Sequence, residues 1–394
     1  MLAELLIIHK ENTFTGEDYI VKINIIENKT IISNDDSIFN YFGWPTVARL
    51  KNGKLAVATS GFRLAHVCPF GKCVVSFSEN EGKTWSLPTP VIDTFLDDRD
   101  GGITAFGESS VIVTSFNNEV DFQRNCGIAV YDKGPGSSNS KTRFRAPFAN
   151  AYLDIIEEEH PDWRKYLGST FRISHDNGVT YGDIKTIPIT CPHGPTEMPD
   201  GTLLYVGRRF SENDAFRDET HIACYKVYPD GNYELIGEIE NVGEGYNSCE
   251  PHTILLKDGT LITHIRMEGN GHFSIYQSES ADGGKTWTKP HKLLPERGGA
   301  PAHIIEKDGV LISTYGYRQS PYGIRVMFSY DQGKTWDTNN VLVDSECSSD
   351  LGYPSSVLLE DGNILTVYYA RRNEDRTVEK NSCVIKQVVW TFEK

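Results

Sequence analysis

The stretch Ser280-Ala-Asp-Gly-Gly-Lys-Thr-Trp287 decides the fold, because its pattern occurs four times along the chain. The other copies are Ser78-Glu-Asn-Glu-Gly-Lys-Thr-Trp85, Ser174-His-Asp-Asn-Gly-Val-Thr-Tyr181 and Ser329-Tyr-Asp-Gln-Gly-Lys-Thr-Trp336. In a hairpin turn, the Asp or Asn side chain accepts backbone N–H groups, Gly takes a positive φ, and Thr-Trp begins the next strand with a buried ring. Such spaced self-similarity indicates repeated supersecondary units.

The pattern Ser-x-Asp-x-Gly-x-Thr-Trp resembles the Asp-box of the sialidase superfamily. This resemblance implies a β-propeller, in which each box is a hairpin between the outer strands of one blade. The stretch Tyr228-Pro-Asp-Gly-Asn-Tyr233 lies about where a further, decayed copy is expected. The box is a structural element, so it predicts a fold and carries no chemistry.

A second repeat predicts the number of blades. Apolar strands interrupted by an Asp-Gly-like turn, typical of inner hairpins, recur at Gly53, Gly201, Gly259, Gly309 and Gly362. Residues 103–114 form a degenerate sixth unit, and the last three turns lie 50 and 53 residues apart, which suits blades of four strands. We therefore predict an all-β fold, a six-bladed β-propeller of four-stranded antiparallel blades with Asp-box hairpins.

The repeat runs on without a Pro/Ser-rich linker or a low-complexity stretch, which predicts that residues 1–394 form a single β-propeller domain. Residues 1–40 contain strands at 5–8 and 19–32, and we expect them to close the last blade beside residues 384–392. Residues 145–168 show helical spacing of apolar residues among acidic ones. We expect them to form a short helical insertion in blade 2.

Composition restricts the partners. The net charge of −15 argues against nucleic acid, and no stretch is long and apolar enough to span a membrane. The N-terminus lacks a secretion signal, and eight scattered Cys suggest reduced thiols without a zinc site. We therefore expect a cytoplasmic protein, unless the chain was cut from a secreted precursor. The sequence leaves the oligomeric state open.

Candidate site residues emerge from the same alignment. A Pro precedes the turn Gly by eight residues in four units, so the residues before these Pro take equivalent positions near the central channel: Trp44, Glu250, Ala300 and Tyr353, with Asp100 and the region 193–197 as counterparts. Glu250 and Tyr353 stand out, because a purely structural repeat would tolerate apolar residues there. His193, His252 and His303 also begin inner strands, where each taken alone is better explained by packing.

Five units also place an Arg seven to ten residues after the turn Gly, namely Arg63, Arg208, Arg266, Arg318 and Arg371. One such Arg would more often be a surface salt-bridge partner. Five converging guanidinium groups repel one another unless a carboxylate-bearing ligand or protein acids lie among them. The pattern predicts a pocket for an anionic substrate.

The resemblance to sialidases then becomes specific to residues. The segment from Glu250 to Arg266 is similar to the sialidase segment in which a catalytic Glu precedes a hairpin ending in an Arg, and Gly352-Tyr353-Pro is similar to the strand with the nucleophilic Tyr. This implies Tyr353 as nucleophile and Glu250 as its base. Arg266 and Arg318 would resemble two members of the carboxylate-binding triad, with Arg325 a competitor for Arg318. A neutral Tyr suits a sugar whose anomeric carbon carries a carboxylate.

Two departures from the family pattern remain. Gly43-Trp44-Pro45 stands where sialidases have Arg-Ile-Pro, so the first triad Arg is missing, and the loop that carries the family's acid/base Asp contains no carboxylate but only His66. Arg63 or Arg99 is a candidate for the lost charge. Asp98, Asp100 and His66 are candidates for the acid, although a salt-bridged loop at 97–100 is an equally good interpretation.

These residues predict a retaining exo-glycosidase of sialidase type that acts on a terminal acidic sugar, sialic acid or a relative. The alternatives are a uronate-directed polysaccharide lyase or hydrolase on the same scaffold and a non-catalytic propeller that binds acidic glycans. Each predicts an acidic glycan as partner. Hydrolysis needs no redox or organic cofactor, so we predict neither a cofactor nor a metal. The sugar and its linkage depend on loop shapes that the sequence does not reveal.

Overall fold

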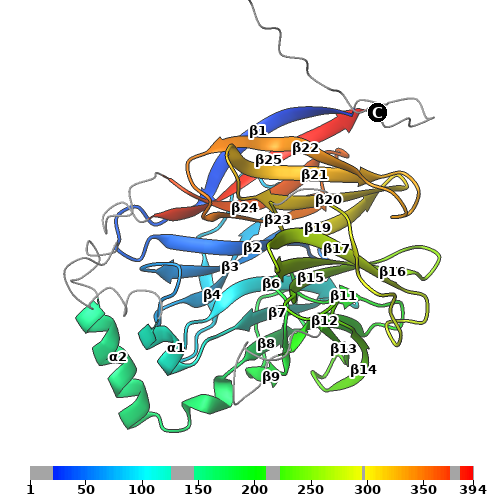
Figure 1. Ribbon diagram of the computed structural model, residues 1–394. Helices are drawn as coiled ribbons and strands as arrows, with labels where there is room; N and C mark the ends of the chain where they lie inside the picture. Colours follow the sequence, from blue (N-terminus) through cyan, green and yellow to red (C-terminus); the bar gives the residue numbers. More distant parts are fainter. Residues whose placement is uncertain (1–20, 126–145, 210–221, 295–297, 373–381, 394) are drawn as a thin grey trace, which may run out of the picture.

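The computed structural model describes residues 21–125, 146–209, 222–294, 298–372 and 382–393. Within these ranges most residues lie in β-strands arranged around a common centre, which confirms an all-β propeller (Figure 1). The described helices are short: α1 (Val120–Asn125), α2 (Ala146–Glu159) and the 3₁₀ helix η3 (Trp163–Tyr166). The strand expected at residues 5–8 lies outside the described residues.

Four sheets are separate antiparallel blades. The first contains β6 (Arg99–Phe106), β7 (Ser110–Phe116), β8 (Ser169–Ser174) and β9 (Lys185–Ile187). The second contains β10 (Ile189–Thr190), β11 (Thr196–Glu197), β12 (Leu203–Arg209), β13 (Ile222–Val227) and β14 (Tyr233–Ile239). The third contains β15 (Asn247–Leu255), β16 (Leu261–Gly269), β17 (His272–Ser280) and β18 (His291–Lys292), and the fourth β19 (Gly299–Lys307), β20 (Val310–Tyr317), β21 (Tyr322–Ser329) and β22 (Asp337–Glu346).

The remaining eight strands form one continuous sheet, so the predicted count of six separate blades is wrong. Its order is β23 (Leu351–Leu358), β24 (Ile364–Arg371), β25 (Cys383–Glu393), β2 (Tyr41–Arg49), β3 (Leu55–Arg63), β4 (Lys72–Ser78) and β5 (Thr89–Ile92), and β1 (Lys22–Ile32) pairs antiparallel with β25. The physical reason is a parallel bridge between Tyr41 and Cys383, which joins the strands expected in the first and last blades.

The inner strands of the sheets contact one another in a closed series, in the order β2, β6, β11, β15, β19, β23 and back to β2. Apolar side chains fill the space between neighbouring sheets. Trp390 of β25, for example, is fully buried beside Phe328 of β21, and its indole N–H donates to the Thr366 hydroxyl over 2.9 Å. Burial of aromatic side chains of this kind contributes about 2–3 kcal/mol each.

The Asp-boxes form the hairpins between the two outer strands of their sheets. In the copy between β17 and β18, the Asp282 carboxylate accepts the backbone N–H groups of Lys285 and Thr286 at 3.1 and 2.9 Å, and the Ser280 hydroxyl accepts the Gly284 N–H at 3.0 Å. Gly284 has a φ of 92°, which favours glycine. The decayed copy at 228–233 occupies the same place between β13 and β14.

The chain between β7 and β8 contains helix α2, although the two strands pair with each other directly, and the helix packs against the loop after β3. Its buried residues Ala149, Leu153 and Ile156 follow helical spacing and so form one apolar face. Leu153 and Ile156 belong to a cluster with Trp163, whereas Ala149 packs against the loop residue Cys68. The helix therefore supports the loop at residues 64–71, one wall of the site described next.

Candidate functional site

The inner strands carry a β-bulge at the positions that the sequence alignment made equivalent. Trp44, Asp100, Glu250 and Tyr353 have φ values of 57°, 48°, 50° and 50°, and the strand register shifts at each. Positive φ is rare for non-glycine residues, and such strain is concentrated at functional sites. Bulges also re-aim side chains out of the ladder. The repeat thus delivers four different side chains to one centre.

Tyr353 and Glu250 are directly hydrogen-bonded. The Tyr353 hydroxyl donates to one carboxylate oxygen of Glu250, and Arg266 donates to the other over 2.6 Å. The same Arg266 nitrogen lies 3.3 Å from the Tyr353 oxygen, and its other terminal nitrogen pairs with Glu268. Strands β23, β15 and β16 therefore place a phenol, a carboxylate and a guanidinium in mutual contact.

The charge states of this pair suit a neutral nucleophile with a base beside it. Burial raises the pKa of Tyr353 well above its ordinary value, and the charges of Glu250 and Asp100 raise it further, against Arg266 and Arg318. Burial alone would raise the pKa of Glu250, but the charge of Arg266 and the hydrogen bonds from Tyr353 and Arg266 outweigh it, so this pKa is lowered. A neutral phenol thus donates to an ionised carboxylate.

Arg318 is the arginine best placed to receive an anion. Its guanidinium carbon lies 5.6 Å from the centre of the Tyr353 ring, and its Nε donates to the Leu351 carbonyl over 3.0 Å. Among the described residues, no carboxylate lies within salt-bridge distance of it. Arg325, by contrast, donates to the carbonyls of Val343 and Pro321 inside its own sheet. Between these two competitors, the structure brings Arg318 to Tyr353.

Three of the other predicted arginines are held by the protein itself. Arg63 forms an ion pair of 2.6 Å with Asp97, both side chains being fully buried, and Arg371 pairs with Asp350 over 3.1 Å. Arg208 is buried in β12. Protein acids therefore lie among the converging guanidinium groups, which is one of the two ways in which such a cluster becomes tolerable.

Arg99, one candidate for the missing charge, lies against Trp44. Its guanidinium carbon is 4.5 Å from the ring centre of Trp44, the residue that occupies the lost position. Asp97 lies 4.0 Å away, and the buried Nε of Arg99 has no hydrogen-bond partner in the described part of the chain. Arg63 also stacks on Trp44, at 5.0 Å, but is committed to Asp97.

The two candidate aspartates of this run differ in their surroundings. Asp98 is fully buried and accepts both the backbone N–H and the hydroxyl of Thr94, at 2.6 and 2.9 Å, which makes it part of the loop's internal support. Asp100 is 4 % exposed, and one of its oxygens lacks a hydrogen-bond partner among the described residues. Burial raises the pKa of both carboxyl groups to about 7.

His66 lies at the mouth of the site, and a residue that the sequence analysis missed holds it there. Its Nδ1 lies 2.9 Å from the Tyr41 hydroxyl and 3.3 Å from the Asp350 carboxylate, while the ring packs edge-on against Trp44 at 4.9 Å. Tyr369 also donates to Asp350, over 3.1 Å. Asp350 lies immediately before β23, the strand that carries Tyr353, and this position was the one sequence signal for it.

Three histidines from different sheets close the channel beneath the site. The rings of His252 and His303 stack at 4.0 Å, and His193 lies edge-on to them, 6.4 Å from the Tyr353 ring. The backbone N–H of Ile304 donates to Nδ1 of His252 over 3.0 Å. Burial lowers the pKa of all three imidazoles well below the ordinary value. Among the described residues, no three His, Cys, Asp or Glu side chains are arranged so that they could hold a metal ion together.

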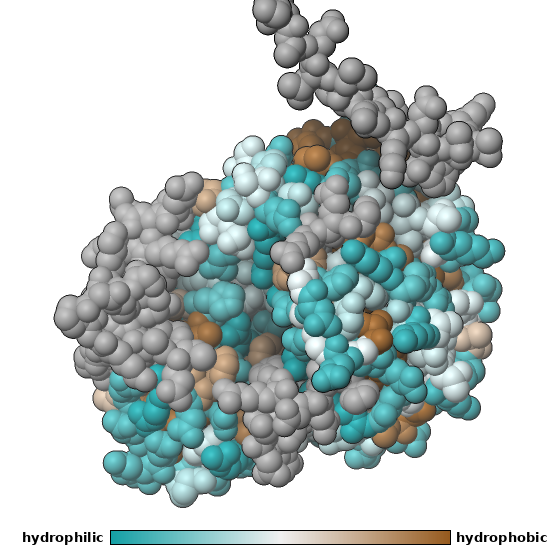
Figure 2. All heavy atoms as spheres, viewed as in Figure 1, coloured by the Kyte–Doolittle hydropathy of each residue, from teal (hydrophilic) through white to brown (hydrophobic). Residues whose placement is uncertain are grey.

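The molecular surface is consistent with access to this centre. Figure 2 shows the face hollowed near its middle, above the inner strands.

No helix within the described ranges combines the length and apolar character needed to cross a bilayer.

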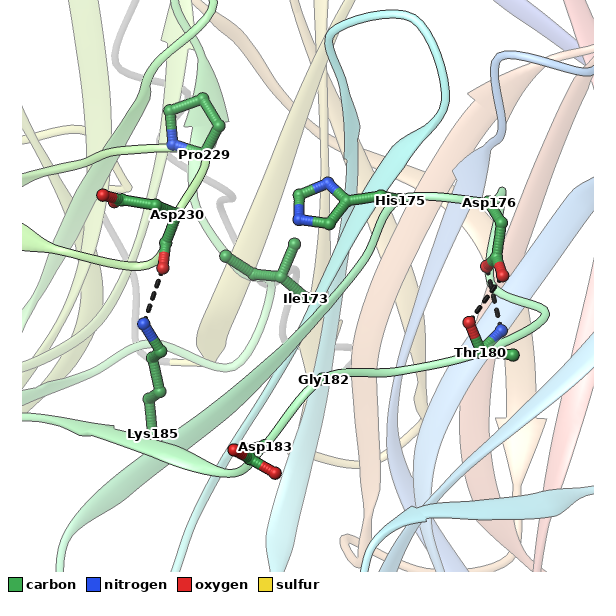
Figure 3. A pocket seen from close by; sticks show the side chains of 9 residues that line it. All are labelled: Ile173, His175, Asp176, Thr180, Gly182, Asp183, Lys185, Pro229 and Asp230. Carbon is green, nitrogen blue, oxygen red and sulfur yellow. Dashed lines mark hydrogen bonds between the residues drawn. The ribbon is translucent and has the colours of Figure 1, made fainter.

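A separate cavity of about 270 Å³ lies at the outer strands, between the Asp-box after β8 and the turn before β14 (Figure 3). Asp176 is bound there by Thr180, and the Lys185 ammonium donates to the Asp230 carbonyl over 2.6 Å. Hydrogen bonds lower the pKa of Asp176 to about 2. None of the predicted site residues lines this cavity, so it is a feature of the hairpin surface.

Comparisons with known proteins identify the family of this chain. The family model described as BNR repeat-like domain matches residues 151–366. A protein named sialidase from Paraclostridium sordellii is 30% identical over 150 residues, covering 35% of this chain and 34% of that relative, about a third of its length.

Solved structures share the fold. A protein of unknown function from Dyadobacter fermentans has a TM-score of 0.71 at 18% identity, covering 94% of this chain and 99% of that chain. The NanB sialidase from Streptococcus pneumoniae has a TM-score of 0.62 at 12% identity, covering 93% and 70%. The intramolecular trans-sialidase from Ruminococcus gnavus has 0.60 at 13% identity, covering 91% and 96%.

Proposed function

Since the chain belongs to the BNR repeat-like domain family and is a divergent member of the sialidase superfamily, we propose that it is a retaining exo-glycosidase for a terminal acidic sugar, sialic acid or a close relative. The observation that carries this proposal is the hydrogen bond from the Tyr353 hydroxyl to the Glu250 carboxylate, with Arg266 on the same carboxylate. An acidic-glycan-binding module has no need of a base beside a buried phenol.

In the proposed reaction, the sugar carboxylate binds at Arg318 and Arg99. Arg318 has no acid within salt-bridge distance among the described residues, and the nearest acid to Arg99, Asp97 at 4.0 Å, is already paired with Arg63. The Tyr353 oxygen attacks the anomeric carbon while its proton passes to Glu250. The glycosidic bond breaks, and the leaving oxygen takes a proton from an acid at the mouth of the site. Water then attacks the glycosyl-tyrosine and gives a proton back to the group that acted as the acid. The phenolate recovers its proton from Glu250, and configuration is retained over the two displacements.

The test of the function is release of a fluorescent aryl alcohol from an aryl α-sialoside by the purified protein, with the corresponding neutral hexoside as control. Turnover of the sialoside alone supports the proposal. Absence of turnover, together with an ultraviolet-absorbing unsaturated product from a uronate glycan, would favour the lyase alternative instead. Glycan binding without turnover of either substrate would favour the non-catalytic alternative.

Replacement of Arg318 by Met is expected to lower kcat/KM for the aryl α-sialoside about 10- to 100-fold. The reason is the loss of charge-assisted hydrogen bonds worth about 1.5–3 kcal/mol to the sugar carboxylate. The matched control is Arg49→Met, which removes a guanidinium paired with Glu81 at an inner-hairpin turn away from the site. Equal effects of the two replacements on kcat/KM would contradict the assigned role of Arg318.

The pH dependence of kcat/KM should show an acid limb set by Glu250. Only the ionised carboxylate accepts the phenol proton, and its pKa is lowered from 4.5, so activity should persist as pH falls below 4.5 and be lost as the pH passes the lowered pKa. Glu250→Gln removes the base and is expected to cost about 10²- to 10⁴-fold in turnover. An acid limb at or above pH 4.5 would be inconsistent with this base.

A further inference from the structure

His66 and Asp350 form a hydrogen-bonded pair beside the pocket. The Asp350 carboxylate accepts hydrogen bonds from Tyr41, Tyr369 and Arg371 at 3.0, 3.1 and 3.1 Å, and lies 3.3 Å from Nδ1 of His66. Four contacts hold the carboxylate in one orientation. Since Asp350 and Tyr41 both face Nδ1, the proton of the neutral imidazole resides there and Nε2 is the reactive nitrogen.

The reactive nitrogen is open to the pocket. The His66 side chain is 48 % exposed, and its Nε2 makes no hydrogen bond to any described residue. Its ring contacts Trp44 at 4.9 Å, and Trp44 in turn contacts Tyr353 at 6.4 Å. His66 therefore lies one aromatic ring from the nucleophile, on the side where an aglycone must leave toward solvent.

The protein fixes the loop that carries this histidine. The buried guanidinium of Arg63 donates to the carbonyls of Ala65 and His66 at 3.3 and 2.8 Å. The Cys68 N–H donates to Asp97 over 3.1 Å, and helix α2 covers the loop through Ala149. A loop held by buried ionic and apolar contacts positions a catalytic group more accurately than a free loop does.

We propose that the Asp350–His66 pair replaces the family's acid/base aspartate, with His66 as the catalytic acid and base and Asp350 as its positioning residue. This inference rests on the proposed glycosidase function. Asp98 is sealed inside the loop by Thr94, and Asp100 is almost fully buried on the nucleophile side. Both carboxyl groups are buried, whereas the His66 side chain is 48 % exposed and faces the solvent into which a leaving group extends.

The proton balance of both steps is complete with these groups. In the first step, imidazolium Nε2–H gives its proton to the leaving glycosidic oxygen as the Tyr353 oxygen bonds to the anomeric carbon and Glu250 takes the phenol proton. In the second step, neutral Nε2 removes a proton from the attacking water. Glu250 returns its proton to the departing phenolate, and both residues end in their starting states.

Charged groups on every neighbouring element set the titration of His66. Desolvation of the ring within the pocket lowers the pKa of His66 from 6.5, and the charges of Arg99 and Arg318 lower it further. The hydrogen bond and charge of Asp350 oppose this lowering, and Tyr41 is uncharged. The acid form is protonated, so kcat/KM should fall as pH rises through a pKa below 6.5. Asp350→Asn removes the opposing charge, which should move this alkaline limb to lower pH.

The experiment compares two sialosides in the full-length protein: an aryl α-sialoside, whose phenolate leaves with little protonation, and a sialyl-alkyl glycoside, whose alkoxide needs a proton. His66→Ala should lower kcat/KM, which reports formation of the glycosyl-enzyme, about 10²- to 10⁴-fold for the alkyl glycoside. It should lower kcat/KM for the aryl sialoside far less. His291→Ala, an exposed histidine elsewhere, is the matched control and should change neither.

Three outcomes would overturn the pair. Equal losses of kcat/KM on both substrates in His66→Ala would make His66 structural. A large loss for the alkyl glycoside and a small loss for the aryl sialoside in Asp100→Asn instead would make Asp100 the acid. An unmoved alkaline limb of kcat/KM in Asp350→Asn would remove the positioning role of Asp350. Histidine NMR titration gives a readout independent of turnover: the pKa of His66 should fall in Asp350→Asn. If the wild type cleaves neither sialoside, the proposed function fails, and an unchanged His66 pKa in that titration would separately refute the pair.

Discussion

Tyr353→Phe is expected to abolish turnover of an aryl α-sialoside, lowering kcat by at least about 10³-fold. The replacement removes only the oxygen that forms the covalent bond, while the ring keeps its contacts with Trp44 and Arg318. The measurement is the initial rate of fluorescent alcohol release from wild-type and variant protein at matched concentrations. Loss of the hydrogen bond to Glu250 should alter stability by only about 0.5–1.5 kcal/mol.

The control for this prediction is Tyr205→Phe. Tyr205 is a fully buried tyrosine of β12, packed in an apolar cluster between outer parts of two sheets. This control tests whether loss of a buried phenolic oxygen alone lowers turnover of the aryl α-sialoside. If Tyr353→Phe retained turnover within about tenfold of the wild type, a tyrosine nucleophile would be ruled out and Glu250 would need another partner.

Arg63→Met is expected to have the largest effect on stability, lowering the free energy of unfolding by about 3–5 kcal/mol. Both members of the Arg63–Asp97 pair are fully buried, so the replacement leaves the carboxylate inside the protein with only the more distant Arg99, at 4.0 Å, as an ion-pair partner among the described residues. The space is tailored to the pair: a Cβ at Gly71 would lie 2.0 Å from an Arg63 nitrogen. Urea unfolding followed by tryptophan fluorescence gives the midpoint shift.

A double replacement separates the ionic cause from lost packing. Arg63→Met with Asp97→Leu removes both charges and should recover much of the lost stability, because a buried ion pair can often be exchanged for apolar side chains at little net cost. Arg49→Met, at a partly exposed ion pair, should cost only about 0–1 kcal/mol. A similarly small cost for Arg63→Met would show that Arg63 is accessible and restore it as a candidate ligand for the substrate.

Repetition made much of the architecture predictable. The Asp-boxes and Asp-Gly turns occur where local rules for turns apply, so each copy could be identified from its own residues. Counting from those turns also aligned Trp44, Glu250 and Tyr353 and suggested Asp100 as their counterpart, and the structure then revealed a bulge that these four residues share. The merged sheet was not predictable in this way, because the bridge between Tyr41 and Cys383 joins residues far apart in the chain.

The partners of the arginines were equally hidden in the sequence. Arg63, Arg266 and Arg318 look alike in the repeat, yet Arg63 pairs with a buried acid, Arg266 bonds the catalytic candidate Glu250, and Arg318 has no acid beside it in the described chain. Burial and pairing depend on tertiary contacts rather than on spacing. Asp350 was missed for the same reason, since its contacts with Tyr41, His66 and Arg371 are tertiary.

The continuous eight-stranded sheet has a consequence for how the protein matures. The two halves of that sheet join where three residues meet: Tyr41 in β2, Asp350 before β23 and Cys383 in β25. The Asp350–His66 pair depends on this junction. During synthesis on the ribosome, the edge of β2 that pairs with β25 has no partner until β25 has been made. The centre therefore assembles only when the ring closes, so a chain that lacks β25 cannot bring Tyr41, Asp350 and Cys383 together.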